Sequence, residues 1–187
     1  MSLADILEEL EAAKDLHKAG PMEAYMRYQF SFLGIAGPER NALYKKYFPS
    51  AKKTKLIDWD FVDTCWGKDA REYQYVAANY LKAMQSYLTK DDLPKLERLV
   101  VTKSWWDTVD ILDRVVGSLV ADHPKLEDVL LKWSLSDNIW LRRVAIDHQL
   151  LRKEKTNVQL MEKILVNNLD QTEFFINKAI GWALRDY

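Results

Sequence analysis

Residues 104–110 read Ser-Trp-Trp-Asp-Thr-Val-Asp, and they open an apolar pattern that runs on to residue 122. Apolar residues recur along this stretch at three- and four-residue spacing, which predicts a helix over 105–122. Trp106 and Asp110 are four residues apart and therefore share one face of that helix. Because Asp110 lies near the positive end of the helix dipole, we expect an ionised carboxylate beside an aromatic wall. Such an arrangement is suited to stabilising a cation.

The residues around this motif repeat along the chain. Positions separated by 34 residues carry similar side chains, and they form two sets: Ala77, Ile111, Ala145 and Ala179, and Trp106, Trp140 and Phe174. A period of this length is typical of a helix pair that buries its apolar face only against neighbouring pairs. Because the Trp-Leu-Gly-Tyr signature of tetratricopeptide repeats is missing, the pattern favours HEAT-like helix pairs. We therefore predict an α-solenoid, an αα superhelix with a concave face.

The same periodicity extends over the rest of the sequence and predicts an all-α fold with no confident strand. Only 6 Gly and 5 Pro interrupt it, and long polar linkers are missing, so we expect a single domain over residues 1–187. Ser104 and Asp107 have the spacing of a capping box, which gives Asp107 a structural task. The predicted helices cover residues 2–17, 21–33, 38–48, 54–66, 71–88, 91–102, 105–122, 125–135, 139–152, 157–168 and 173–187.

Composition limits the possible classes of protein. The chain has 187 residues, a formal net charge of -1 and 48% hydrophobic residues, enough for a substantial core. Its single cysteine, Cys65, excludes an intrachain disulfide, and His17, His123 and His148 lack metal-ligand spacing, so no metal site is expected. No apolar run approaches a membrane span, and the amino terminus is acidic where a signal peptide is basic. We expect a soluble, cytoplasmic protein.

Basic residues interrupt the apolar pattern of the repeating helices at Arg71, Arg142, Arg143, Lys178 and Arg185, with Asp110 as the lone anion. If these helices line the concave face, that face is positively charged although the whole chain is not. A positive groove is the footprint of phosphate binding. The alternative is that these side chains form a solvated rim, as charged residues usually do.

Four separated stretches form a further pattern: residues 21–26 with 32–35 and 38–40, residues 102–110, residues 136–143 and residues 173–182. These stretches resemble the AlkD family of HEAT-like-repeat DNA glycosylases, which remove alkylated purines from DNA. The similarity covers nearly the whole chain, and members of this family usually continue with a further helix pair beyond the position of Tyr187. The resemblance therefore implies that the carboxy-terminal helices usual in the family are lacking here.

The resemblance also implies roles for individual residues. Asp110 matches the family's catalytic aspartate, and Trp106 and Trp182 match the indoles that pack around the lesion nucleotide. Tyr25 matches a tyrosine near the lesion, and Arg143 matches an arginine that contacts the DNA backbone. Weaker candidates for DNA binding are Arg142, Lys103 and Lys178. Trp105 and Trp140 are expected to be core or repeat-stacking residues, because the neighbour of a face-presenting residue points elsewhere on a helix.

These expectations lead to a monofunctional DNA glycosylase that needs no cofactor and no metal and that acts as a monomer on double-stranded DNA containing alkylated bases. The resemblance implies that the duplex lies against the concave face without insertion of the lesion into a deep pocket. An alternative is a solenoid that binds DNA structure without cutting the glycosidic bond, since a fold alone does not confer activity. A protein-interaction scaffold is a third possibility, but a scaffold has no need of the set Trp106, Asp110, Arg143 and Trp182.

Overall fold

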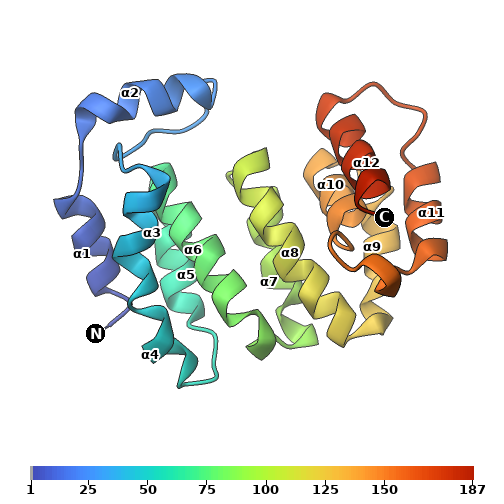
Figure 1. Cartoon of the computed structure of the whole chain (residues 1–187), viewed down its shortest axis with the longest axis horizontal. Helices are drawn as coiled ribbons and strands as arrows, with labels where there is room; N and C mark the ends of the chain where they lie inside the picture. Colours follow the sequence, from blue (N-terminus) through green and yellow to red (C-terminus); the bar gives the residue numbers. More distant parts are fainter. Residues whose placement is uncertain (1) are drawn as a thin grey trace. The chain divides into compact units, whose positions relative to one another are not determined.

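The computed structural model describes residues 2–187, and over this range the chain is all-helical, which confirms the predicted fold class (Figure 1). One isolated bridge between Ser31 and Ala70 is the only β-pairing among the described residues. None of the helices they form combines the length and the apolarity that a membrane crossing demands. The α-helices are α1 (Asp5–Ala12), α2 (Leu16–Tyr25), α3 (Gly37–Lys45), α4 (Phe48–Lys52), α5 (Trp59–Gly67), α6 (Arg71–Met84), α7 (Leu93–Val101), α8 (Trp106–Asp122), α9 (Glu127–Trp133), α10 (Ile139–Asp147), α11 (Val158–Val166) and α12 (Phe174–Asp186).

The internal contacts divide the chain into two compact units, one ending at Tyr87 and one formed by residues 88–187. The expectation of a single domain over residues 1–187 stays a prediction. In the first unit, α5 packs along α6, and α6 is buried over most of its length. The second unit contains α7 to α12, in which α7 packs on α8, α9 packs on α10, and α11 packs on α9 and α10.

The helix predicted over residues 21–33 is wrong, because α2 begins at Leu16 and ends at Tyr25. The Asp15 carboxylate caps its start by accepting from the amide of His17, and two residues with positive φ follow its end. The segment after them is extended and gives its backbone donors to a buried side chain: the Glu72 carboxylate accepts from the amides of Leu33, Gly34 and Ile35 at 2.9 to 3.1 Å. A distant carboxylate therefore overrides the local helical pattern.

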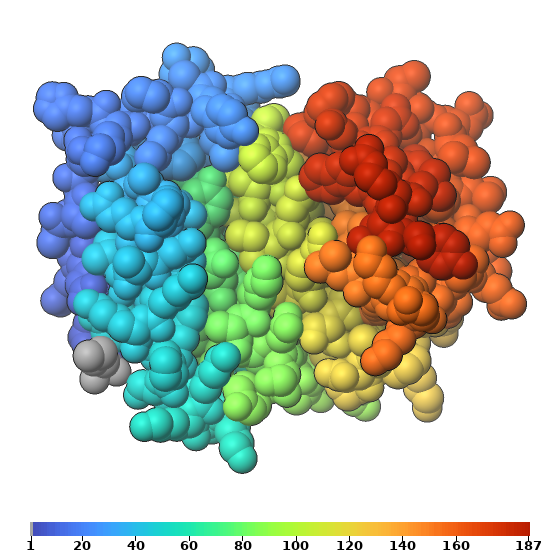
Figure 2. Space-filling model, viewed as in Figure 1, coloured from blue at the N-terminus to red at the C-terminus, as the bar shows by residue number. Residues whose placement is uncertain are grey.

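The second unit shows the predicted repeat. Its second helices pack in order, α8 on α10 and α10 on α12, and side chains fill the space between them in the contiguous yellow-to-red surface of Figure 2. Two of the three aromatic residues differ from the predicted set, each by one position, and Trp140 is the same. Trp105, Trp140 and Phe175 form the stack, with ring centroids 5.0 to 5.8 Å apart, whereas Phe174 is exposed. Trp105 and Trp140 thus stack between repeats, as expected.

Gly117 marks the closest approach of α8 to the end of α10. A Cβ atom built on Gly117 would lie 2.1 Å from the carbonyl oxygen of His148, which is a backbone atom that cannot turn away.

We expect Gly117→Ala to lower the free energy of unfolding by about 1–3 kcal/mol, as overpacking does. Urea unfolding checks this, with Gly181→Ala as the matched control. Gly181 is an exposed position of α12, and no atom lies within 4 Å of a Cβ built on it. This control should be neutral or more stable by up to about 1 kcal/mol, and an equally mild effect of both substitutions would contradict the steric account.

Candidate functional site

A paired carboxylate and guanidinium form the centre of the site, which lies entirely in the second unit. Asp110 projects from α8 and Arg143 from α10. Arg143 donates from Nε to Asp110 Oδ1 at 2.8 Å and from Nη2 to Oδ2 at 3.0 Å, so the pair is bidentate. Its Nη1 donates to the carbonyl oxygen of Phe175 at 2.6 Å. The Arg143 side chain is 2% exposed and that of Asp110 is 21% exposed. Asp110 is therefore held in a fixed orientation while part of it faces solvent.

Indole rings lie close to this pair. The guanidinium carbon of Arg143 is 5.0 Å from the centroid of the Trp182 ring, a cation–π distance. Trp182 comes from α12 and is half-buried. Trp106 is also half-buried and begins α8, one helical turn before Asp110. The structure therefore brings Asp110, Arg143 and Trp182 together, with Trp106 on the same helix as the carboxylate.

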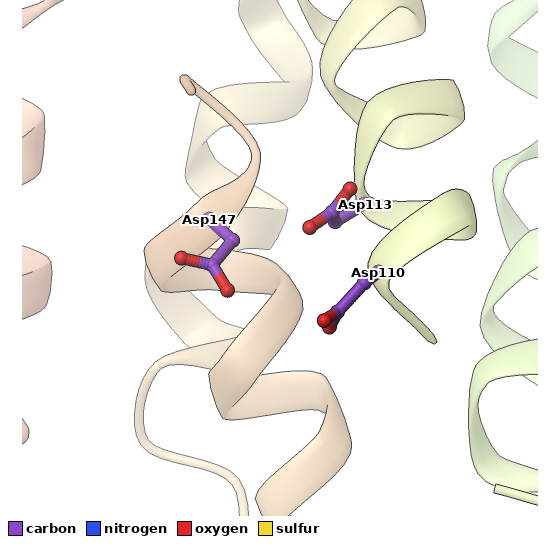
Figure 3. Close-up of side chains that lie close together, drawn as sticks. All are labelled: Asp110, Asp113 and Asp147. Carbon is purple, nitrogen blue, oxygen red and sulfur yellow. The ribbon is translucent and has the colours of Figure 1, made fainter. Parts of the chain in front are cut away.

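Two further carboxyl groups, those of Asp113 and Asp147, lie close to that of Asp110, and the three side chains converge from α8 and α10 (Figure 3). We call Asp110, Asp113 and Asp147 the acidic cluster. One carboxylate oxygen from each residue lies within 4.8 Å of the others. Asp113 pairs with Arg114, whose Nε is 3.2 Å from Asp113 Oδ1, and Asp147 Oδ2 is 3.9 Å from the Nε of Arg143.

Burial raises the pKa of two members of this cluster, Asp113 and Asp147. It raises the pKa of Asp113 well above the usual range, and the charge of Asp147 raises it further. It also raises the pKa of Asp147 to about 7, although the Arg143 guanidinium acts in the opposite direction. Burial lowers the pKa of Arg143, but its hydrogen bonds and charge interactions with Asp110 outweigh that effect, so its pKa is raised. The ion pair of Asp110 and Arg143 therefore lies beside two carboxyl groups that hold protons readily.

The acidic cluster offers carboxylate oxygens, the ligand type that divalent cations prefer. Two guanidinium groups already supply positive charge at the same place, from Arg143 and Arg114. A further cation would have to compete with both for the same oxygens. We therefore interpret the cluster as a group of interacting charges around the ion pair of Asp110 and Arg143.

The remaining candidates for DNA contact are placed differently. Arg142 donates from Nε to Asn168 Oδ1 at 2.7 Å and is half-buried. Lys103 lies in the loop before α8 with a φ of 49°, and Lys178 is exposed on α12, one turn before Trp182. Tyr25, in the first unit, is 73% exposed and lines a hollow of about 540 Å³. The interactions of these residues with DNA stay predictions.

Two expectations about charged and capping residues need correction. Arg71 and Arg143, expected on a basic concave face, are both buried. The guanidinium carbon of Arg71 lies 3.7 Å from the centroid of the Phe30 ring, and Arg143 donates hydrogen bonds to Asp110. The capping box is also wrong, because Trp105 occupies the N-cap position of α8 and the Ser104 hydroxyl donates to the carbonyl oxygen of Val100.

Asp113 and Asp147 were missed in the sequence. They are separated by 34 residues, so they occupy the same position of the repeat. Asp113 follows Asp110 by three residues and Asp147 follows Arg143 by four, which places each on the face of its known neighbour. A search for polar residues at equivalent positions of the apolar repeat would have found both.

Comparisons with known proteins agree with this reading of the fold. Residues 6–187 match the family described as DNA alkylation repair enzyme. The chain is also similar to a solved structure described as a predicted DNA alkylation repair enzyme from Enterococcus faecalis, with 36% sequence identity and a TM-score of 0.84. That similarity covers 93% of this chain and 83% of the other. A comparison with curated proteins gave no match. The chain belongs to the DNA alkylation repair enzyme family.

Proposed function

We propose that this protein is a DNA glycosylase that hydrolyses the N-glycosidic bond of purines alkylated at N3 or N7 in duplex DNA. The observation that carries the proposal is the Asp110 carboxylate, which is partly exposed, fixed by two hydrogen bonds from Arg143, and part of the group that includes the Trp182 indole. Membership of the DNA alkylation repair enzyme family supports damaged DNA as the substrate.

The charge of the substrate explains why one carboxylate suffices. A purine alkylated at N3 or N7 is cationic, so the electron pair of the breaking C1′–N bond neutralises the base as it leaves. The leaving base then needs no general acid, unlike the leaving group of an ordinary glycosidase, which uses two carboxyl groups. The demanding step is the oxocarbenium ion that develops on the deoxyribose. A fixed anion such as Asp110 stabilises that cation without reorganisation.

Asp110 also has a second task in this proposal. The oxygen of a water molecule forms the new bond to C1′ and loses a proton. Asp110 orients this water and accepts its proton, as a general base does. Trp106 and Trp182 form aromatic walls whose faces attract the developing sugar cation. Tyr25, Arg142, Lys103 and Lys178 are proposed to contact the DNA around the lesion, the cationic ones through its phosphates.

The wild-type protein is expected to release 7-methylguanine and 3-methyladenine from methylated duplex DNA without added metal or cofactor. The released bases are measured by liquid chromatography with mass spectrometry, against a protein-free sample because alkylated purines also leave spontaneously. DNA binding is measured in parallel as a function of salt concentration. Salt-sensitive binding without base release above the protein-free rate would refute the glycosylase and favour the alternative, a protein that recognises DNA structure without catalysis.

A further inference from the structure

Asp147 is an unusual neighbour for a catalytic ion pair, because it is buried and poorly paired. The residue is 0% exposed, and neither of its carboxylate oxygens has a hydrogen-bond partner. Its nearest cation is Arg143, at 3.9 Å from Nε. Arg143 directs its hydrogen bonds elsewhere, to Asp110 and to the carbonyl oxygen of Phe175. Asp147 therefore interacts with Arg143 through charge alone.

The charges around Asp147 come from two helices. Asp110, Asp113 and Arg114 face it from α8, and Arg143 faces it from α10. Four other helices also pack against α10: α7, α9, α11 and α12. None of their charged side chains is buried. His148, the next residue, is buried and neutral, since burial lowers its pKa to about 3, although the contact of its Nδ1 with the carbonyl oxygen of Ala145, at 2.6 Å, acts in the opposite direction. The protonation of Asp147 thus depends mainly on its burial and on the charges of Arg143, Asp110 and Arg114.

We propose that Asp147 is a positioning residue that sets how much negative charge Asp110 presents to the substrate. When Asp147 is neutral, the positive charge of Arg143 acts on Asp110 and cancels most of the negative charge of that carboxylate. When Asp147 is ionised, Arg143 is shared between two carboxylates, and the site gains one negative charge. This inference rests on the proposed glycosylase function, because its effect is on the stabilisation of a sugar cation.

The direction of the effect follows from the sign of the charges. Burial raises the pKa of Asp147 to about 7, so the residue loses its proton as the pH rises through neutrality. An added anion stabilises a cationic transition state more than the neutral ground state of the sugar. We therefore expect base release to accelerate by about tenfold as the pH rises through 7, from Coulomb's law at the effective dielectric of a partly buried site. Burial also raises the pKa of Asp113 well above the usual range.

The test compares single-turnover base release by the wild type and by Asp147→Asn from pH 5.5 to 8.5, with enzyme in excess over methylated duplex DNA. Titration of the substrate affects both proteins equally. The wild-type rate should rise through about pH 7, whereas the rate of Asp147→Asn should stay near the wild-type value at low pH. Asp122→Asn, an exposed change on α8, is the control and should retain the rise.

Failure of this inference is distinct from failure of the proposed function. If the wild type releases no base, the glycosylase proposal fails. If the wild type releases base and Asp147→Asn has the same pH dependence, only the role of Asp147 is refuted. A purely structural role of Asp147 would change the rate equally at every pH, and that outcome also refutes it.

A second measurement covers the case in which Asp147→Asn does not fold. Carbon-13 NMR of aspartate carboxyl groups in the wild type should show a buried carboxyl that titrates near pH 7. In Asp110→Asn the same titration should move to lower pH, because one neighbouring anion is removed and Arg143 becomes available to Asp147. The inference is overturned if no carboxyl titrates between pH 5.5 and 8.5, or if Asp110→Asn leaves the midpoint unchanged.

Discussion

Asp110→Asn should reduce the rate of base release by about a hundredfold to a thousandfold, the range found when a fixed electrostatic stabiliser is removed from an active site. Asparagine has the same shape as aspartate but no charge, so it can neither balance the oxocarbenium ion nor accept a proton from water. Its side-chain oxygen still accepts one hydrogen bond from Arg143, which donates twice to Asp110 in the wild type. The rate is measured under single-turnover conditions with saturating enzyme, so that weakened DNA binding does not enter.

Asp122→Asn provides the matched comparison for Asp110→Asn. It makes the same chemical change on the same helix, at a position exposed to solvent. The control should keep wild-type activity, and both variants should bind undamaged duplex DNA with similar salt dependence. Release of 7-methylguanine by Asp110→Asn at the wild-type rate would exclude Asp110 as the catalytic anion.

Arg143→Met should lower the free energy of unfolding by about 3–5 kcal/mol, the cost of breaking a buried ion pair by removing one partner. Methionine occupies a similar volume, so the loss reflects charge more than packing. Asp110 would lose two hydrogen bonds, the Phe175 carbonyl would lose its donor, and Asp147 would lose its nearest cation. Urea unfolding measures the effect.

The double variant Asp110→Asn with Arg143→Met should recover part of the loss, because the uncompensated charge of Asp110 is then removed. Strict additivity of the two single changes would contradict a coupled pair.

DNA binding by the same variant separates two roles for Arg143. Loss of a phosphate contact reduces the slope of log affinity against log salt by about one, as the resemblance of Arg143 to a backbone-contacting arginine implies. A guanidinium that only orients Asp110 would leave the slope unchanged. From its burial and its three protein acceptors we expect the second result, together with slow base release. Arg143→Lys tests the geometry, since lysine keeps the charge but cannot bind a carboxylate in the bidentate manner.

The helical periodicity of the sequence predicted a large part of the fold, because helix formation depends on local interactions. A helix is defined by hydrogen bonds and side-chain neighbours a few residues apart, so α8, α10 and α12 could be predicted to within a few residues from their apolar spacing. Prediction failed where a distant group controls the backbone. The segment after α2 is extended because Glu72, about 38 residues away, accepts from its amides. The start of α8 was predicted with a cap at Ser104, whose hydroxyl instead turns back to the end of α7.

By itself the sequence determined an all-helical chain with a 34-residue repeat, the family, and a tryptophan and an aspartate on one helix face. The packing of α8 on α10 decided the charge interactions of Asp110. It placed Asp110 against Arg143, 33 residues later, and buried Asp147 beside them. Periodicity reports which face of a helix is apolar, but the energy of an ion pair depends on separation and on burial. Both quantities exist only after the helices have packed.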